Sequence, residues 1–175
     1  MNCETYDCWA KECADEGVTL VKDIQNLLPI DPKKHKRVLL ELMGDFPSNK
    51  RVCESFVREL EARGFEVTVY EPEGFEVMED SVESFKSRYD LIFYVGNIET
   101  ASNKTVSRLN WHTMFGLGNN MPWMVHEMPA LFVSVGNPYH LLDAPMIKTF
   151  VNGYCNSEYV IHAVVEKLCG DSEFK

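Results

Sequence analysis

The sequence predicts one α/β domain over residues 1–175, a three-layer sandwich built on a mostly parallel, flavodoxin-like sheet of about five to six strands. The prediction depends on three apolar runs, at residues 37–45 (RVLLELMGD), 90–97 (DLIFYVGN) and 131–137 (LFVSVGN). Each run contains β-branched, leucine or aromatic residues and reaches a glycine that a polar side chain follows. Such runs are typical of strands buried on both faces, as in a parallel sheet covered by helices.

The N-terminal part of the chain is expected to contribute a helix and a short strand. Residues 4–16 have helical periodicity, and Gly17 is a residue type that ends helices. Residues 18–21 (VTLV) then suit a short strand. The side of the helix that we expect to be buried carries four residues at helical spacing: Tyr6, Trp9, Ala10 and Cys13.

The middle of the chain alternates strands and helices. After the strand at residues 37–43, Ser48 is expected to cap a helix that runs to about residue 63. Residues 65–70 alternate apolar and polar side chains, which favours an edge strand with one wetter face. Asp80 is expected to cap the helix that precedes the strand at residues 90–97.

The second half of the chain begins with its least regular stretch, residues 98–125, which is rich in aromatic side chains. A long irregular segment of this kind serves either function and docking or plain packing. Strands are expected at residues 131–135 and 148–154, and a closing helix at residues 157–168 with Gly170 beyond its end. Because strands and helices alternate, right-handed crossovers should connect the parallel strands.

Composition excludes several functions. The net charge of −10 argues against nucleic-acid binding, which needs clustered lysine and arginine. No segment approaches the roughly 20 apolar residues of a membrane span, and residues 1–12 do not resemble a signal peptide. The six cysteines are scattered without a CxxC pair, so we expect free thiols in a reducing, cytoplasmic location and no metal site.

Local chemistry offers no self-contained active site. The phosphate-binding patterns GxGxxG and GxxxxGK[ST] are missing, so no cofactor is expected. The GxSxG elbow is also missing, Ser134 lies within a predicted strand, and Cys53 lies on the inner side of a predicted helix. His112 and His140 are the two histidines that loops could bring to a site, although a hydrogen-bonded loop role would explain each equally. These residues indicate a binding or docking domain.

Two stretches resemble a known family. Residues 17–30 (GVTLVKDIQNLLPI), followed by the basic turn 33–37 and a strand, look like the opening of the C-terminal α/β domain of glycoside hydrolase family 3. Residues 131–142 (LFVSVGNPYHLL), followed by residues 147–154 and a helix, resemble the β-N-acetylhexosaminidase branch of that family. The likeness extends over nearly the whole chain.

The resemblance implies that the chain belongs beside an N-terminal (β/α)₈ barrel, which holds the sugar and the aspartate nucleophile in complete members. In the glucosidase branch the α/β domain lends an acid/base glutamate, whereas in the hexosaminidase branch an Asp–His pair of the barrel takes that role. Retaining hydrolysis needs two catalytic groups about 5 Å apart. The chain is then a domain cut from a longer enzyme or a stand-alone descendant, and we expect it to be inactive alone.

The site is expected where the three glycine turns meet, because loops at the carboxyl ends of parallel strands form the ligand crevice of such sheets. These turns contain Gly44, Gly96 and Gly136. No residue there is predicted to be catalytic, and the expected role is to dock the barrel or to shape the rim of a carbohydrate site. The residues predicted to line this edge are Asp45, Phe46, Asn97, Arg108, Trp111, His112, Asn137 and Tyr139.

Two other functions remain open at this point. One is a stand-alone flavodoxin-like binding or regulatory module, although the polar residues after the predicted strands do not match a receiver domain or a flavin phosphate loop. The other is an α/β enzyme that uses His112 or His140 with a nearby carboxylate.

Overall fold

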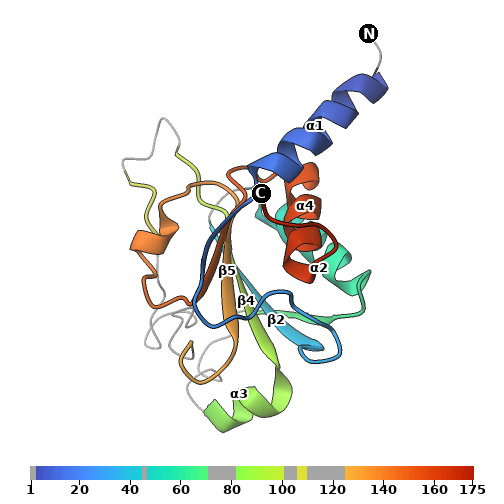
Figure 1. Cartoon of the computed structure of the whole chain (residues 1–175). Helices are drawn as coiled ribbons and strands as arrows, with labels where there is room; N and C mark the ends of the chain where they lie inside the picture. The colour runs from blue at the N-terminus through green and yellow to red at the C-terminus, as the bar shows by residue number, and fades with distance from the viewer. Residues whose placement is uncertain (1–2, 45–46, 71–81, 101–105, 110–124) are drawn as a thin grey trace.

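A twisted sheet runs through the centre of the structure, a computed structural model that describes residues 3–44, 47–70, 82–100, 106–109 and 125–175 (Figure 1). Within these residues six strands form one sheet, in the order β1-β6-β5-β4-β2-β3. Neighbouring strands are parallel except β1, which pairs antiparallel with β6. The strands are β1 (Thr19–Asp23), β2 (Arg37–Met43), β3 (Glu66–Val69), β4 (Leu91–Gly96), β5 (Ala130–Ser134) and β6 (Thr149–Asn152).

Helices cover the two faces of the sheet. On one face α2 and α4 pack over the strands and α1 packs against α4; their buried residues, such as Phe56 and Val164, share one core with Leu40 of β2. On the other face Phe85 of α3 joins a second core with Tyr94 of β4. The helices are α1 (Cys3–Gly17), α2 (Asn49–Glu61), α3 (Val82–Arg88), the 3₁₀ helix η2 (His140–Leu142) and α4 (Glu158–Cys169).

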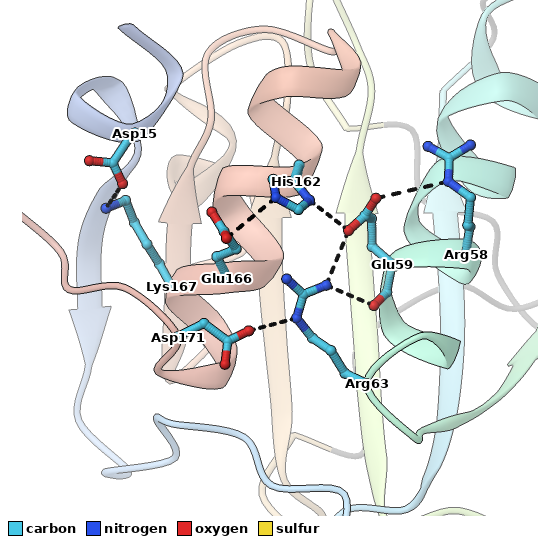
Figure 2. Close-up of polar contacts among 8 residues, drawn as sticks. All are labelled: Asp15, Arg58, Glu59, Arg63, His162, Glu166, Lys167 and Asp171. Atoms are coloured by element: carbon cyan, nitrogen blue, oxygen red, sulfur yellow. Dashed lines mark hydrogen bonds and ion pairs between the residues drawn. The ribbon is translucent and has the colours of Figure 1, made fainter. Parts of the chain in front are cut away.

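A polar network joins α2 to α4 on the first face. Glu59 of α2 lies 3.1 Å from Arg63 Nη1 and 2.8 Å from His162 Nδ1 of α4 (Figure 2). His162 Nε2 lies 3.3 Å from Glu166, and Arg63 donates to Asp171 at 2.8 Å. The hydrogen bonds from His162 and Arg63 lower the pKa of Glu59 despite partial burial, which raises it.

The sandwich architecture and the mostly parallel sheet confirm the predicted fold class. The predicted strand at residues 65–70 appears as β3 at the edge of the sheet, as its alternating pattern indicated. Ser48 occupies the N-cap position of α2, as predicted, but its side chain makes no capping hydrogen bond. Its φ of −73° and ψ of −12° are helical, whereas a capping side chain needs an extended backbone to reach the first amides. Asp80 lies outside the described residues.

The predicted buried side of the first helix is also wrong. Tyr6 and Trp9 are 49% and 56% exposed, Cys13 is exposed and Ala10 is half-buried, whereas Ala14 is buried. The helix projects from one end of the domain, with the N-terminus at its far end (Figure 1). Because α1 packs mainly on α4 alone, only a narrow seam of it can be covered.

Candidate functional site

The carboxyl ends of the parallel strands form one continuous edge. Across the sheet, Met43 pairs with Gly96, Gly96 with Ser134, and Ser134 with Asn152. On the far side Asn152 pairs with Thr19, the first residue of β1. The turns after β2, β4 and β5 therefore leave the sheet side by side, as the sequence predicted for its three glycine turns.

Two of these glycines permit close contact between neighbouring turns. A Cβ atom on Gly44 would collide with the backbone oxygen of Asn97, and one on Gly136 would lie 2.8 Å from the backbone oxygen of Ile98. Contacts below 3.0 Å do not occur for real Cβ atoms. Both positions therefore need glycine, since any side chain would push the turn after β4 away from its neighbours.

The turn after β4 begins with Asn97, a fully buried polar residue that binds three neighbours. Its Nδ2 donates to Asn49 Oδ1 at 2.6 Å and to Ser48 Oγ at 3.2 Å, both at the start of α2. Its Oδ1 accepts from Asn156 Nδ2 at 3.0 Å, in the turn after β6. The same Nδ2 of Asn156 donates to Glu99 Oε1 at 3.0 Å. We call these five residues the amide cluster; it fixes the ends of β4 and β6 against the start of α2.

A pocket of about 380 Å³, which we call the edge pocket, opens beside the amide cluster. Glu99 belongs to both, because it lines the pocket and binds Asn156. The other lining residues are Thr100, Gly136, Asn137, Pro138 and Tyr139. Tyr139 is 68% exposed at the rim, so its ring is free to stack on a ligand. The combination of an exposed aromatic ring, amides and one carboxylate suits a hydroxyl-rich ligand.

Below the pocket a buried serine and histidine hold the turn after β5. Ser134 Oγ lies 2.8 Å from His140 Nδ1, and Ser134 also donates to the backbone oxygen of Asn137. His140 is fully buried, and burial lowers its pKa, so the imidazole is neutral. Because neither side chain reaches solvent, His140 serves the packing of the turn, which is the alternative that the sequence left open for it.

The predicted edge residues are partly assembled by the structure. Asn137 donates to the Ser107 backbone oxygen at 3.2 Å, which connects the turn after β5 with residues 106–109. Arg108 forms an ion pair with Asp143 just beyond η2, and this carboxylate also accepts from the Leu109 amide at 3.1 Å. Four predicted edge residues lie outside the described residues: Asp45, Phe46, Trp111 and His112.

Sequence reasoning missed four residues of the amide cluster, namely Ser48 as a hydrogen-bond partner, Asn49, Glu99 and Asn156. Asn156 could have been found, because the predicted strand at 148–154 ends at the same edge as the other parallel strands. The role of Asn49 could not, since it depends on how the start of α2 lies against the turn after β4.

The described residues were also compared with the requirements of a metal site and of a membrane-spanning helix. There, no three His, Cys, Asp or Glu side chains lie close enough to hold a metal ion. In the same part of the chain, no helix has the length and apolar character needed to cross a bilayer. Among the cysteines whose side chains are described, no disulfide is formed by Cys8, Cys13, Cys155 or Cys169.

Comparison with known proteins assigns the chain to a family. It is 37% identical to a β-N-acetylglucosaminidase/β-glucosidase of Cellulomonas fimi, over 97% of this chain and 31% of that enzyme. The solved structure of the β-glucoside phosphorylase BglX matches with a TM-score of 0.88 at 38% identity, over 98% of this chain and 31% of that one. The chain belongs to glycoside hydrolase family 3, as its C-terminal α/β domain.

More distant members of glycoside hydrolase family 3 share the fold. A family 3 β-N-acetylglucosaminidase of Paenibacillus sp. str. FPU-7 matches with a TM-score of 0.61 at 16% identity, over 99% of this chain and 32% of that one. No protein-family model matches the sequence. The chain thus spans 31% of the length of the family 3 relatives that it matches at 37–38% identity.

Proposed function

We propose that the chain is the accessory domain of a family 3 enzyme that acts on β-glucosides or β-N-acetylglucosaminides, working beside a (β/α)₈ barrel. One observation carries the proposal: the similarity covers 97% of this chain but only 31% of the Cellulomonas fimi enzyme. Most of the relative therefore lies outside the matched part, and we assign its catalytic machinery to that remainder.

The substrate class follows from the relatives and from one segment. The Cellulomonas fimi relative is named for both β-N-acetylglucosaminidase and β-glucosidase activity, and BglX is a β-glucoside phosphorylase. The LFVSVGNPYHLL segment that resembles the hexosaminidase branch contributes Asn137, Pro138 and Tyr139 to the edge pocket. A terminal β-glucosyl or β-N-acetylglucosaminyl group is the ligand class that we assign to this pocket.

The role of the pocket is to shape the sugar site and not to break the bond. Among the described residues that line it, Glu99 is the only carboxylate, and its Oε1 is held by Asn156. Glycoside hydrolysis by the usual route needs a second carboxyl group, about 5 Å away in retaining enzymes. We assign that group and the nucleophile to the barrel, and we propose a cytoplasmic location for the whole enzyme.

A chimera tests the proposal. In it, this chain replaces the matched part of the Cellulomonas fimi enzyme, and turnover of aryl β-glucosides and aryl β-N-acetylglucosaminides is measured. We expect kcat/KM within roughly a hundredfold of the natural enzyme, since a misplacement of about 1 Å can cost that factor.

The matched controls are the rest of that enzyme alone and the same portion fused to an unrelated flavodoxin-like domain. Both should be essentially inactive, because neither supplies the edge pocket. A chimera no more active than the unrelated fusion would contradict the proposed function and favour a stand-alone module.

A further inference from the structure

Glu99 is the only charged side chain among the described residues that line the edge pocket. We propose that it makes the pocket select sugars by charge, so that uncharged or positively charged terminal sugars bind and anionic sugars, such as sugar 6-phosphates and uronic acids, are excluded. This inference rests on the proposed function, because it adds a criterion of substrate choice to the same sugar site.

The carboxylate of Glu99 is held in a fixed position by two turns. Its Oε1 accepts a hydrogen bond from Asn156 Nδ2 at 3.0 Å, in the turn after β6. Its stem packs over the turn after β5, since a Cβ atom on Gly136 would lie 3.1 Å from Glu99 Cγ. Asn156 is itself fixed, because the same Nδ2 donates to Asn97 Oδ1 at 3.0 Å. A carboxylate supported in this way stays in place when a ligand enters, so its charge acts on that ligand.

Two arginines near the same edge are engaged elsewhere and do not neutralise Glu99. Arg51 Nη2 donates to the backbone oxygen of Asn156 at 3.1 Å, and Arg51 is not among the residues that line the pocket. Arg108 forms an ion pair with Asp143. In the part of the chain that the structure describes, no lysine, arginine or histidine forms an ion pair with Glu99. The negative charge of the pocket is therefore uncompensated there.

A carboxylate accepts hydrogen bonds and donates none. Sugar hydroxyls and the ammonium group of an amino sugar can donate to it, whereas a phosphate dianion or a second carboxylate offers only acceptors and adds like-charge repulsion. The net charge of −10 acts in the same direction over longer distances.

The amide of Asn137, which also lines the pocket, is already used within the domain. Its Nδ2 donates to the Ser107 backbone oxygen at 3.2 Å, and its Oδ1 accepts from the Tyr139 backbone amide at 2.9 Å. Asn137 therefore has no free amide hydrogen bond with which to attract an anion in place of a cation, and Glu99 decides the charge preference of the pocket.

Inhibition of the chimera with the Cellulomonas fimi enzyme tests the proposal. The inhibitors are glucosamine, glucose and glucose 6-phosphate, at slightly acidic pH where the amine is protonated, and the readout is turnover of an aryl β-glucoside. We expect glucosamine to inhibit at the lowest concentration and glucose 6-phosphate at the highest. Glu99→Gln keeps an acceptor for Asn156 but removes the charge. It should lower the preference for glucosamine over glucose, and for glucose over glucose 6-phosphate, by roughly tenfold or more each.

Two control variants separate local charge from shape and from net charge. Glu99→Asp keeps the negative charge and should preserve the order of the three inhibitors. Glu61→Gln makes the same change in net charge at an exposed position at the far end of α2, roughly 18 Å from the start of that helix. Because salt screens exposed charges over that distance, Glu61→Gln should leave the inhibition constants unchanged. A shift in the ratios as large as that of Glu99→Gln would assign the effect to net charge and overturn the proposal.

The outcomes separate this inference from the proposed function. An active chimera in which Glu99→Gln leaves the ratios of the inhibition constants unchanged overturns charge selection and leaves the accessory role intact. If glucose 6-phosphate inhibits neither protein, the ratio of glucosamine to glucose decides. An inactive chimera contradicts the proposed function, and saturation-transfer NMR of the isolated chain with the three sugars then tests charge selection. Equal signals from the wild-type chain and from Glu99→Gln, or no signals from either, overturn it.

Discussion

Glu41 lies directly across from Tyr94 in the register between β2 and β4, and both side chains are buried in the second core. Glu41 Oε1 has no hydrogen-bond partner among the described residues. Burial raises the pKa of Glu41 to about 8, from an ordinary value of 4.5. The carboxyl group is therefore protonated at neutral pH, and Glu41 interrupts an otherwise apolar central strand.

This burial makes stability dependent on pH. Below pH 4.5 Glu41 is protonated in both the folded and the unfolded state and has no effect. Between pH 4.5 and 8 the unfolded state ionises first, so the free energy of unfolding falls as the pH rises, by a total on the order of 3–5 kcal/mol. Glu41→Gln should remove this dependence. Urea unfolding measures the free energy of unfolding of wild type and Glu41→Gln. The two values should be nearly equal at pH 4.5, and the variant should be the more stable protein at pH 8.

The ion pair between Asp15 of α1 and Lys167 of α4 predicts a second effect on the stability of the fold. Lys167 has a fully buried side chain, so Asp15→Asn leaves its ammonium group without the carboxylate and should cost about 1–3 kcal/mol. Lys167→Met should cost less, because it removes the buried charge itself. Glu16→Gln, an exposed neighbour of Asp15, is the matched control and should change little. Equal losses from Asp15→Asn and Glu16→Gln would show that the pair does not stabilise the fold.

The same ion pair makes the stability of the fold depend on pH in acid. The hydrogen bond from Lys167 lowers the pKa of Asp15 below its ordinary value of 3.8. A depressed carboxyl pKa contributes stability that is present above pH 3.8 and is lost as the pH falls below it. Wild type and Asp15→Asn should therefore differ most near neutral pH and converge at about pH 2.

Gly96 allows β4 to pass under His140. A Cβ atom at this position would lie 2.9 Å from His140 Nδ1 and 2.9 Å from the Phe132 ring. Gly96→Ala should therefore destabilise the fold by about 1–3 kcal/mol, as overpacked cores do. At Gly17, in α1, a Cβ atom would meet nothing within 4 Å. Gly17→Ala should be neutral or stabilise the fold by up to about 1 kcal/mol. Thermal denaturation of both variants distinguishes a steric effect at Gly96 from a general effect of replacing glycine.

A substitution in the edge pocket should change the KM of the chimera more than its kcat. Tyr139→Ala should raise KM by roughly tenfold with little change in kcat, as for loss of uniform substrate binding. Tyr139→Phe should retain the natural KM because it keeps the ring. If KM and kcat both stay unchanged, Tyr139 does not contact the sugar, whereas a fall in kcat alone would assign it an interaction made only in the transition state.

Glu99 tests whether this domain donates an acid or base. If its role is confined to the rim and to Asn156, Glu99→Gln should lower kcat of the chimera by less than about tenfold, whereas loss of a general acid/base costs about 10²–10⁴. A loss in that larger range, with a change in the pH profile of kcat, would identify Glu99 as the acid/base group.

Much of the fold could be predicted because the decisive signals are local. The runs that end at Gly44, Gly96 and Gly136 each contain a strand and the turn after it, and parallel pairing then fixes the shared edge. The exposure of Trp9 could not be predicted, since it depends on which neighbour covers α1. The partners of Asn97 could not be predicted either, because they come from elements distant in sequence.

The central claim is that this domain contributes to a sugar site but carries no bond-breaking group. The most direct test incubates the isolated chain with aryl β-glucosides and aryl β-N-acetylglucosaminides, with and without phosphate, and measures release of the aryl group. The account predicts a rate equal to that of the buffer blank under every condition. Sustained turnover that a single substitution such as Glu99→Gln abolishes would contradict it.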